Sequence, residues 1–194
     1  MDSRTEQPII FSTDTVRAIL AGRKWMTRRA ITPRPVLKRA NGGLAYYWKE
    51  HECFDIQGLC RYCPYGQTGD KLWVREAFYI WQDENNNPQV RYKSDWTVKP
   101  VLFRWKSPLF MPKRAARIWL EITGLRVERL QDITKDDAIA EGMLPAPDDP
   151  IEEFAQLWDS LHAARGYLWH SNPFCWVLSF KKGGKGNADM DLGR

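Results

Sequence analysis

The sequence predicts an α+β fold, a small barrel-like sheet with short helices beside it. Apolar residues alternate with smaller or polar ones in residues 118–127 and 174–180, a pattern typical of strands, and Gly124 predicts a bulge. An aromatic and β-branched run in residues 71–81 predicts a third strand. Strands spread along the chain up to its end suit a barrel, in which the last strand pairs with an earlier one.

Helical spacing marks a segment near the N-terminus. Residues 12–14 offer candidate N-caps, and Gly22 stands where a glycine commonly ends a helix. Between them Val16, Ile19 and Leu20 share one helical face. We therefore expect a short amphipathic helix that ends just before the glycine.

Two more helices are expected towards the C-terminus. Thr134 followed by Asp137 resembles a capping box and predicts a short helix through Ala140, which Gly142 ends. Residues 151–162 have the pattern of an amphipathic helix. Its apolar stripe consists of Phe154, Leu157, Trp158 and Leu161.

The remaining segments are predicted from turn and breaker residues. Paired prolines indicate loops at residues 32–39 and 107–113. A polar turn at 83–88 precedes a short run, 89–93, that suits the returning strand of a hairpin. The Gly- and charge-rich residues 181–194 predict a disordered tail.

Composition and charge limit the class of protein. Hydrophobic residues make up 43% of the 194 residues, enough for a core, and no apolar run reaches the ~18 residues of a transmembrane helix. Residues 1–8 are polar, so we expect no secretory signal, no membrane partner, a cytoplasmic location and reduced cysteines. The net charge is +5, with basic clusters at residues 23–39 and 104–117, which permits a polyanionic partner.

Four motifs occur in order along the chain. Residues 22–29 read GRKWMTRR, residues 69–76 read GDKLWVRE, residues 125–133 and 137–142 read LRVERLQDI and DAIAEG, and residues 172–177 read NPFCWV. Together they resemble the motifs of ASCH domains, small β-barrels related to the PUA family of RNA-binding modules. The combination most resembles a branch found in bacteriophages and prophages, sometimes called morphogenetic proteins.

The resemblance implies the domain organisation as well. It covers residues 8–180 as a single PUA-like domain with short flanking helices. This chain is longer than a minimal ASCH domain, with two long insertions near residues 33–67 and 81–117.

The resemblance also implies a candidate reaction. Some small ASCH proteins hydrolyse the amide of N4-acylated cytidines with the Lys and Thr of the first motif and a Glu on a later helix. By position these are Lys24, Thr27 and Glu141. A desolvated Lys amine loses pKa and can act as a base, and a Thr hydroxyl beside it can act as a nucleophile. This chemistry requires no cofactor and no metal.

A binding role without catalysis remains open for the same residues. Lys24 and Thr27 can instead contact a phosphate or a base, with Glu141 as an ion-pair partner. The expected ligands are RNA, single-stranded nucleic acid or a modified nucleoside. The residues expected to bind them are Arg23, Arg28, Arg29, Lys113, Arg114 and Arg117.

A second function of a different class is a non-catalytic phage accessory protein. It would bind a host or virion protein through the two insertions. The aromatic run at residues 46–48 favours this alternative, and the Lys24, Thr27 and Glu141 set favours the first.

Other polar residues are expected to be structural. Cys60 and Cys63 have the spacing of half a zinc site, but His51 and Cys53 are too close together to supply the other half. His162 and His170 are expected at the surface or in packing contacts. Glu76 is a rival acid, for which an ordinary cross-strand pair with Arg75 is the simpler expectation.

Overall fold

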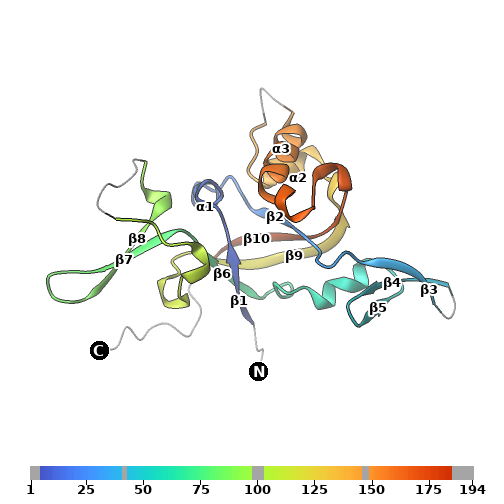
Figure 1. The fold of residues 1–194 in the computed structure, drawn as a ribbon, viewed down its shortest axis with the longest axis horizontal. Helices are drawn as coiled ribbons and strands as arrows, with labels where there is room; N and C mark the ends of the chain where they lie inside the picture. Colours follow the sequence, from blue (N-terminus) through green and yellow to red (C-terminus); the bar gives the residue numbers. More distant parts are fainter. Residues whose placement is uncertain (1–4, 41–42, 98–102, 146–148, 185–194) are drawn as a thin grey trace.

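The chain folds around one mixed sheet. The computed structural model describes residues 5–40, 43–97, 103–145 and 149–184. In spatial order the main sheet consists of β1 (Glu6–Ile10), β6 (Lys71–Arg75), β9 (Trp119–Arg129), β10 (Phe174–Gly183) and β2 (Met26–Ala30). β1 and β6 run parallel, and the other neighbours are antiparallel (Figure 1).

The predicted α+β class is confirmed, but the sheet does not close into a barrel. Within the described residues, β1 and β2 are its two edges and do not pair with each other. The two strands predicted from alternation are its centre, β9 and β10. Their register shifts between Ser179 and Phe180, opposite Gly124, where a bulge was predicted.

The predicted strand at residues 71–81 is two strands. β6 ends at Arg75, and β7 (Phe78–Gln82) pairs instead with β8 (Pro88–Tyr92), the predicted hairpin. The break lies at Glu76 and Ala77, and the Glu76 side chain there is buried.

The three helices begin and end close to where the sequence predicts. They are α1 (Thr13–Leu20), α2 (Lys135–Ala140) and α3 (Pro150–His162). Ser12 and Thr134 accept a backbone N–H as N-caps, and Gly22 and Gly142 follow with φ of 70° and 103°. Leu20 lies at the exposed edge of its helix and outside the core. Among the described residues, no helix is long and apolar enough to cross a membrane.

The first insertion contains strands that the sequence did not indicate. β3 (Val36–Ala40), β4 (Gly43–Trp48) and β5 (His51–Cys53) form a separate antiparallel sheet at one end of the molecule, opposite the β7–β8 hairpin (Figure 1). The loop predicted at residues 32–39 is therefore wrong for its second half, because Val36 and its neighbours pair with β4.

The predicted tail also begins later than expected. Lys181, Lys182 and Gly183 continue β10 and pair with β9, which satisfies their backbone hydrogen bonds. The rest of the predicted tail, residues 185–194, lies outside the described residues.

Apolar packing joins the insertions to the main sheet. The largest buried cluster combines α1, the main sheet and the first insertion. Trp48 of β4 packs edge-on against Trp176 of β10, with ring centroids 5.6 Å apart. A second cluster holds α2 and α3 on the sheet, and a third joins β7 to residues 111–119.

Replacing Trp48 by Ala should lower the stability of the whole domain. Trp48 is 5% exposed, and removing a large buried aromatic side chain costs about 3–5 kcal/mol. Leu44→Ala on the same strand is the matched control, because Leu44 is 60% exposed and its loss should change stability by less than about 0.5 kcal/mol. Urea unfolding followed by core tryptophan fluorescence measures both, and equal midpoints would mean that the first insertion does not support the core.

Candidate functional site

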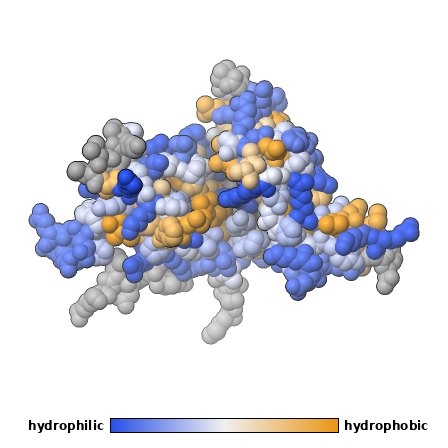
Figure 2. Space-filling view, in the orientation of Figure 1, coloured by the Kyte–Doolittle hydropathy of each residue, from blue (hydrophilic) through white to orange (hydrophobic). Residues whose placement is uncertain are grey.

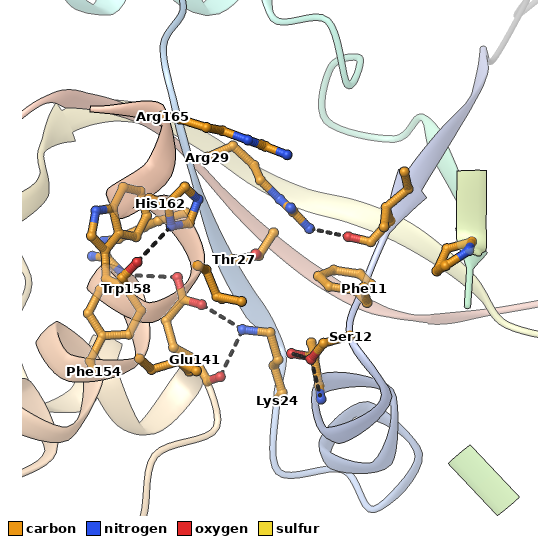
Figure 3. A pocket seen from close by; sticks show the side chains of 16 residues that line it. Phe11, Ser12, Lys24, Thr27, Arg29, Glu141, Phe154, Trp158, His162 and Arg165 are labelled. Carbon is orange, nitrogen blue, oxygen red and sulfur yellow. Dashed lines mark hydrogen bonds and ion pairs between the residues drawn. The ribbon is translucent and has the colours of Figure 1, made fainter. Parts of the chain in front are cut away.

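A cavity of about 310 Å³ lies between α1, β2 and the helical layer of α2 and α3. Lys24 and Glu141 lie at one end of it and Arg29 and Arg165 at the other, with the rings of Phe154, Trp158 and Phe11 along the sides (Figure 3). Figure 2 shows apolar side chains flanked by hydrophilic ones on this face of the molecule. The lining residues used below are Phe11, Lys24, Thr27, Arg28, Arg29, Glu141, Phe154, Trp158, His162 and Arg165.

Lys24 and Glu141 meet in this cavity. Lys24 Nζ lies 2.5 Å from Glu141 Oε2 and 2.8 Å from the Glu141 backbone oxygen. Both side chains are almost fully buried, with 6% and 4% exposure. Thr27 is buried on β2 and lines the same cavity, so the structure brings together the three residues that the motifs indicate.

Local backbone contacts fix this arrangement. The turn after α1 places the Lys24 N–H on the Ala18 carbonyl at 3.2 Å, and the next N–H, that of Trp25, bonds the Ala140 carbonyl at 2.9 Å. Gly142 then passes Lys24 closely: a Cβ on this glycine would lie 3.4 Å from Lys24 Cβ. The end of α2 is thereby held against the start of β2, which directs Glu141 at the Lys24 amine.

Burial and Glu141 act in opposite directions on the charge of the Lys24 amine. Burial lowers the pKa of Lys24 from its ordinary value of 10.5, although the charge of Glu141 acts in the opposite direction. A neutral amine has two N–H donors, and Glu141 accepts two hydrogen bonds from it. The lone pair of the neutral amine is then free to accept a proton from another group.

Arg28 lines the cavity, where its guanidinium is enclosed by carboxylates. Its side chain is fully buried, and Nη2 contacts Glu128 and, at 2.6 Å, Asp137. Its Nη1 lies 3.5 Å from Glu141. Burial acts to lower the pKa of Arg28, but Glu141, Glu128 and Asp137 together raise it above its ordinary value. Arg28 therefore stays charged, and its ion pairs hold the three carboxylates in place.

The other cations predicted to bind a ligand differ in position and in partners. Arg29 lines the cavity, donates to the Ile10 carbonyl at 2.7 Å and lies over Phe11. Arg23 and Arg114 are exposed and do not line the cavity, and Lys113 forms an ion pair with Glu6 at 2.5 Å. Of the predicted cations, Arg28 and Arg29 line the cavity, and Arg23, Lys113 and Arg114 do not.

Arg117 and Glu76 form a network of their own. Arg117 pairs with the buried Glu76 at 2.9 Å and with Asp95 at 2.7 Å. Ser94 also donates to Glu76. Glu76 thus pairs with Arg117 rather than Arg75, and the network anchors the β7–β8 region away from the cavity.

His162 is a site residue that the sequence did not indicate. It lines the cavity and stacks on Trp158 with ring centroids 4.0 Å apart. Its Nδ1 lies 3.0 Å from the Trp158 carbonyl, which can only accept, so Nδ1 carries the proton and Nε2 is an acceptor. Burial lowers the pKa of His162, which favours this neutral form. The sequence feature that could have indicated His162 is its position four residues after Trp158, which places it on the apolar stripe of α3.

The cysteines of the first insertion are free thiols. Burial raises the pKa of Cys63 to about 11. Within the described residues, no group of three or more His, Cys, Asp and Glu side chains could hold a metal ion.

Comparisons with known proteins give distant structural likenesses to solved structures. No protein-family model and no curated protein matches the chain. The structure is similar to an ASCH domain from Lactobacillus crispatus JV V101, with TM-score 0.43, 12% identity, and coverage of 92% of this chain and 79% of that one. It is also similar to protein EF3133 from Enterococcus faecalis V583, of family DUF984, with TM-score 0.42, 11% identity, and coverage of 94% and 78%.

These likenesses name folds that the chain resembles. The function proposed below rests on the cavity and its residues.

Arg28→Met should destabilise the protein strongly. The change leaves Glu128, Asp137 and Glu141 together without their buried cation, and breaking a buried ion pair on one side costs about 3–5 kcal/mol. Arg126→Met is the matched control, since Arg126 contacts two of the same carboxylates from a side chain that is 37% exposed. Its loss should cost less than about 1 kcal/mol.

Urea unfolding at neutral pH compares the two variants. An Arg28→Met midpoint no lower than that of Arg126→Met would contradict the structural role given to Arg28.

Proposed function

We propose that the cavity binds the base of a modified pyrimidine nucleoside and hydrolyses the amide of an N4-acylated cytidine. The observation that carries this proposal is the buried Lys24 amine, held 2.5 Å from Glu141 on a wall shared with Thr27. A buried amine with a lowered pKa and a hydroxyl in the same cavity are the two groups that a base-activated nucleophile requires.

The size and walls of the cavity suit a nucleobase. Its volume of about 310 Å³ lies at the lower end of the ~300–1,000 Å³ typical of small-molecule sites. Phe11 and His162 offer flat faces for stacking, and Leu157 supplies apolar contact. The Nε2 acceptor of His162 suits an N–H of the ligand.

The first half of the reaction uses Lys24 in its neutral form. Its lone pair takes the Thr27 hydroxyl proton while Thr27 Oγ1 attacks the acyl carbon of the amide. Collapse of the tetrahedral intermediate breaks the bond between the acyl carbon and N4. The Lys24 ammonium returns the proton to the leaving nitrogen, which becomes the amino group of cytidine.

The second half regenerates the protein. Water attacks the acyl carbon of the Thr27 ester while Lys24 takes a proton from the water. The bond between the acyl carbon and Thr27 Oγ1 then breaks, the Lys24 ammonium returns the proton to Oγ1, and the carboxylic acid leaves. Glu141 accepts hydrogen bonds from the amine in both halves and stabilises the ammonium each time it forms. The proposal also includes RNA binding, in which the same cavity holds a nucleobase of an RNA strand.

Removing either reacting group should abolish hydrolysis of N4-acetylcytidine. Thr27→Ala, Lys24→Ala and Lys24→Arg should each lower kcat/KM by on the order of a thousandfold or more, because these residues act as one unit. Lys24→Arg belongs in this set because a guanidinium stays protonated and cannot be the base. Release of cytidine, separated by chromatography, measures the rate.

Thr32→Ala is the control, since Thr32 is exposed beyond the end of β2 and should leave the rate unchanged. Circular dichroism checks that each variant is folded. Hydrolysis retained by Lys24→Arg would reduce Lys24 to a charged binding residue, and a wild type inactive on a panel of acylated nucleosides would leave only the binding function.

The wild-type rate should rise with pH. The base must be deprotonated, so kcat/KM increases through the pKa of Lys24, which burial lowers, and is half-maximal below pH 10.5. A pH–rate profile on N4-acetylcytidine provides the measurement. A rate that is constant or falls as the pH rises towards that value would exclude Lys24 as the base.

A further inference from the structure

A second cavity of about 320 Å³ adjoins the first. Its lining consists of Pro8, Ile10, Arg29, Tyr65, Arg75 and Arg165. Ile10, Arg29 and Arg165 line both cavities, so the two spaces meet along the β1 edge of the sheet. In Figure 3, Arg29 and Arg165 lie together at the end of the first cavity away from Lys24 and Glu141.

This second cavity is strongly cationic. Arg29, Arg75 and Arg165 all line it, and none of the described lining residues is acidic. Within the described part of the chain, no carboxylate lies at ion-pair distance from these guanidiniums. By contrast, Arg28 and Arg117 are neutralised by carboxylates.

Hydrogen-bonding capacity is also unused there. The buried Nε atoms of Arg29 and Arg75 have no hydrogen-bond partner among the described residues. Each guanidinium is held in place by a backbone carbonyl, that of Ile10 for Arg29 and that of Leu109 for Arg75. The two guanidiniums are therefore fixed in position while some of their N–H donors lack an acceptor. Leaving a buried donor without an acceptor costs free energy unless a ligand supplies one.

We propose that this second cavity binds a phosphate group of the same ligand whose base occupies the first cavity. The site then takes a cytidine nucleotide, free or within an RNA strand, in preference to the free nucleoside. Guanidinium forks match phosphate oxygens in bidentate geometry, and the Tyr65 hydroxyl offers a further donor. This inference rests on the proposed function for the position of the base.

The test compares ligands within each protein variant. Calorimetry at low salt gives the affinity of the wild type for N4-acetylcytidine and for its 5′- and 3′-monophosphates. At least one monophosphate should bind about tenfold or more tightly than the nucleoside, the gain typical of charge-assisted hydrogen bonds. The gain should shrink as salt is added.

Arg165→Gln is the informative variant, because Arg165 is exposed and its loss should not affect folding. The ratio of nucleotide to nucleoside affinity should fall towards one. Arg39→Gln, an exposed arginine on β3 that lines neither cavity, should keep the wild-type ratio. Equal affinities in the wild type, or a ratio unchanged by Arg165→Gln, would overturn the phosphate site.

A separate probe keeps the two proposals distinguishable. If the wild type binds no nucleoside, the base site fails, and pyrophosphate alone then tests the arginines. Pyrophosphate binding that Arg165→Gln weakens and Arg39→Gln preserves supports the anion site, and no binding overturns it. A trinucleotide with a central N4-acetylcytidine shows whether the phosphate belongs to an RNA strand or to a free nucleotide. An affinity higher than that of the monophosphates indicates an RNA strand, and an equal affinity indicates a free nucleotide.

Discussion

The buried ion pair between Lys24 and Glu141 is the interaction on which the site depends. It joins the start of β2 to the end of α2, two segments 117 positions apart in sequence. Such a pair is costly to desolvate, and its attraction repays the cost only where further hydrogen bonds satisfy both partners. The Glu141 backbone oxygen, which accepts from Lys24, and Arg28, which approaches the other carboxylate oxygen, supply them.

The cationic side chains around the cavity have different roles. Arg28 is locked among carboxylates and organises the site, whereas Arg29 faces the cavities without an acidic partner at ion-pair distance in the described residues. Both arginines line the first cavity from adjacent positions of β2, and they differ in the three carboxylates that surround Arg28. Because the amine has a lowered pKa and the arginines keep their charge, one site combines a base with an anion-binding end.

Local features of the sequence predicted local structure well. The ends of α1 and α2 followed from Ser12, Thr134 and the two glycines, because caps and left-handed turns depend on a few adjacent residues. β9 and β10 followed from strict alternation. The motifs also named the three residues that meet in the cavity.

The features that could not be predicted from the sequence depend on contacts between residues far apart along the chain. β3 became a strand because β4 pairs with it, and the sheet stayed open because β1 and β2 do not meet within the described residues. Arg28 was predicted to bind nucleic acid from the basic cluster around it, and its ion pairs with Glu128 and Asp137 were not foreseen because those residues lie about a hundred positions further along the chain. Arg165 and His162 line the cavity because α3 packs beside it, and this packing could not be predicted from the sequence.

The most direct measurement is an NMR titration of the Lys24 side-chain nitrogen in the folded protein. The pKa should lie below 10.5, since burial outweighs the charge of Glu141. It should fall further in Glu141→Gln, because the carboxylate that raises it is removed. A Lys24 pKa at or above 10.5, or one that Glu141→Gln leaves unchanged, would contradict the account of this site.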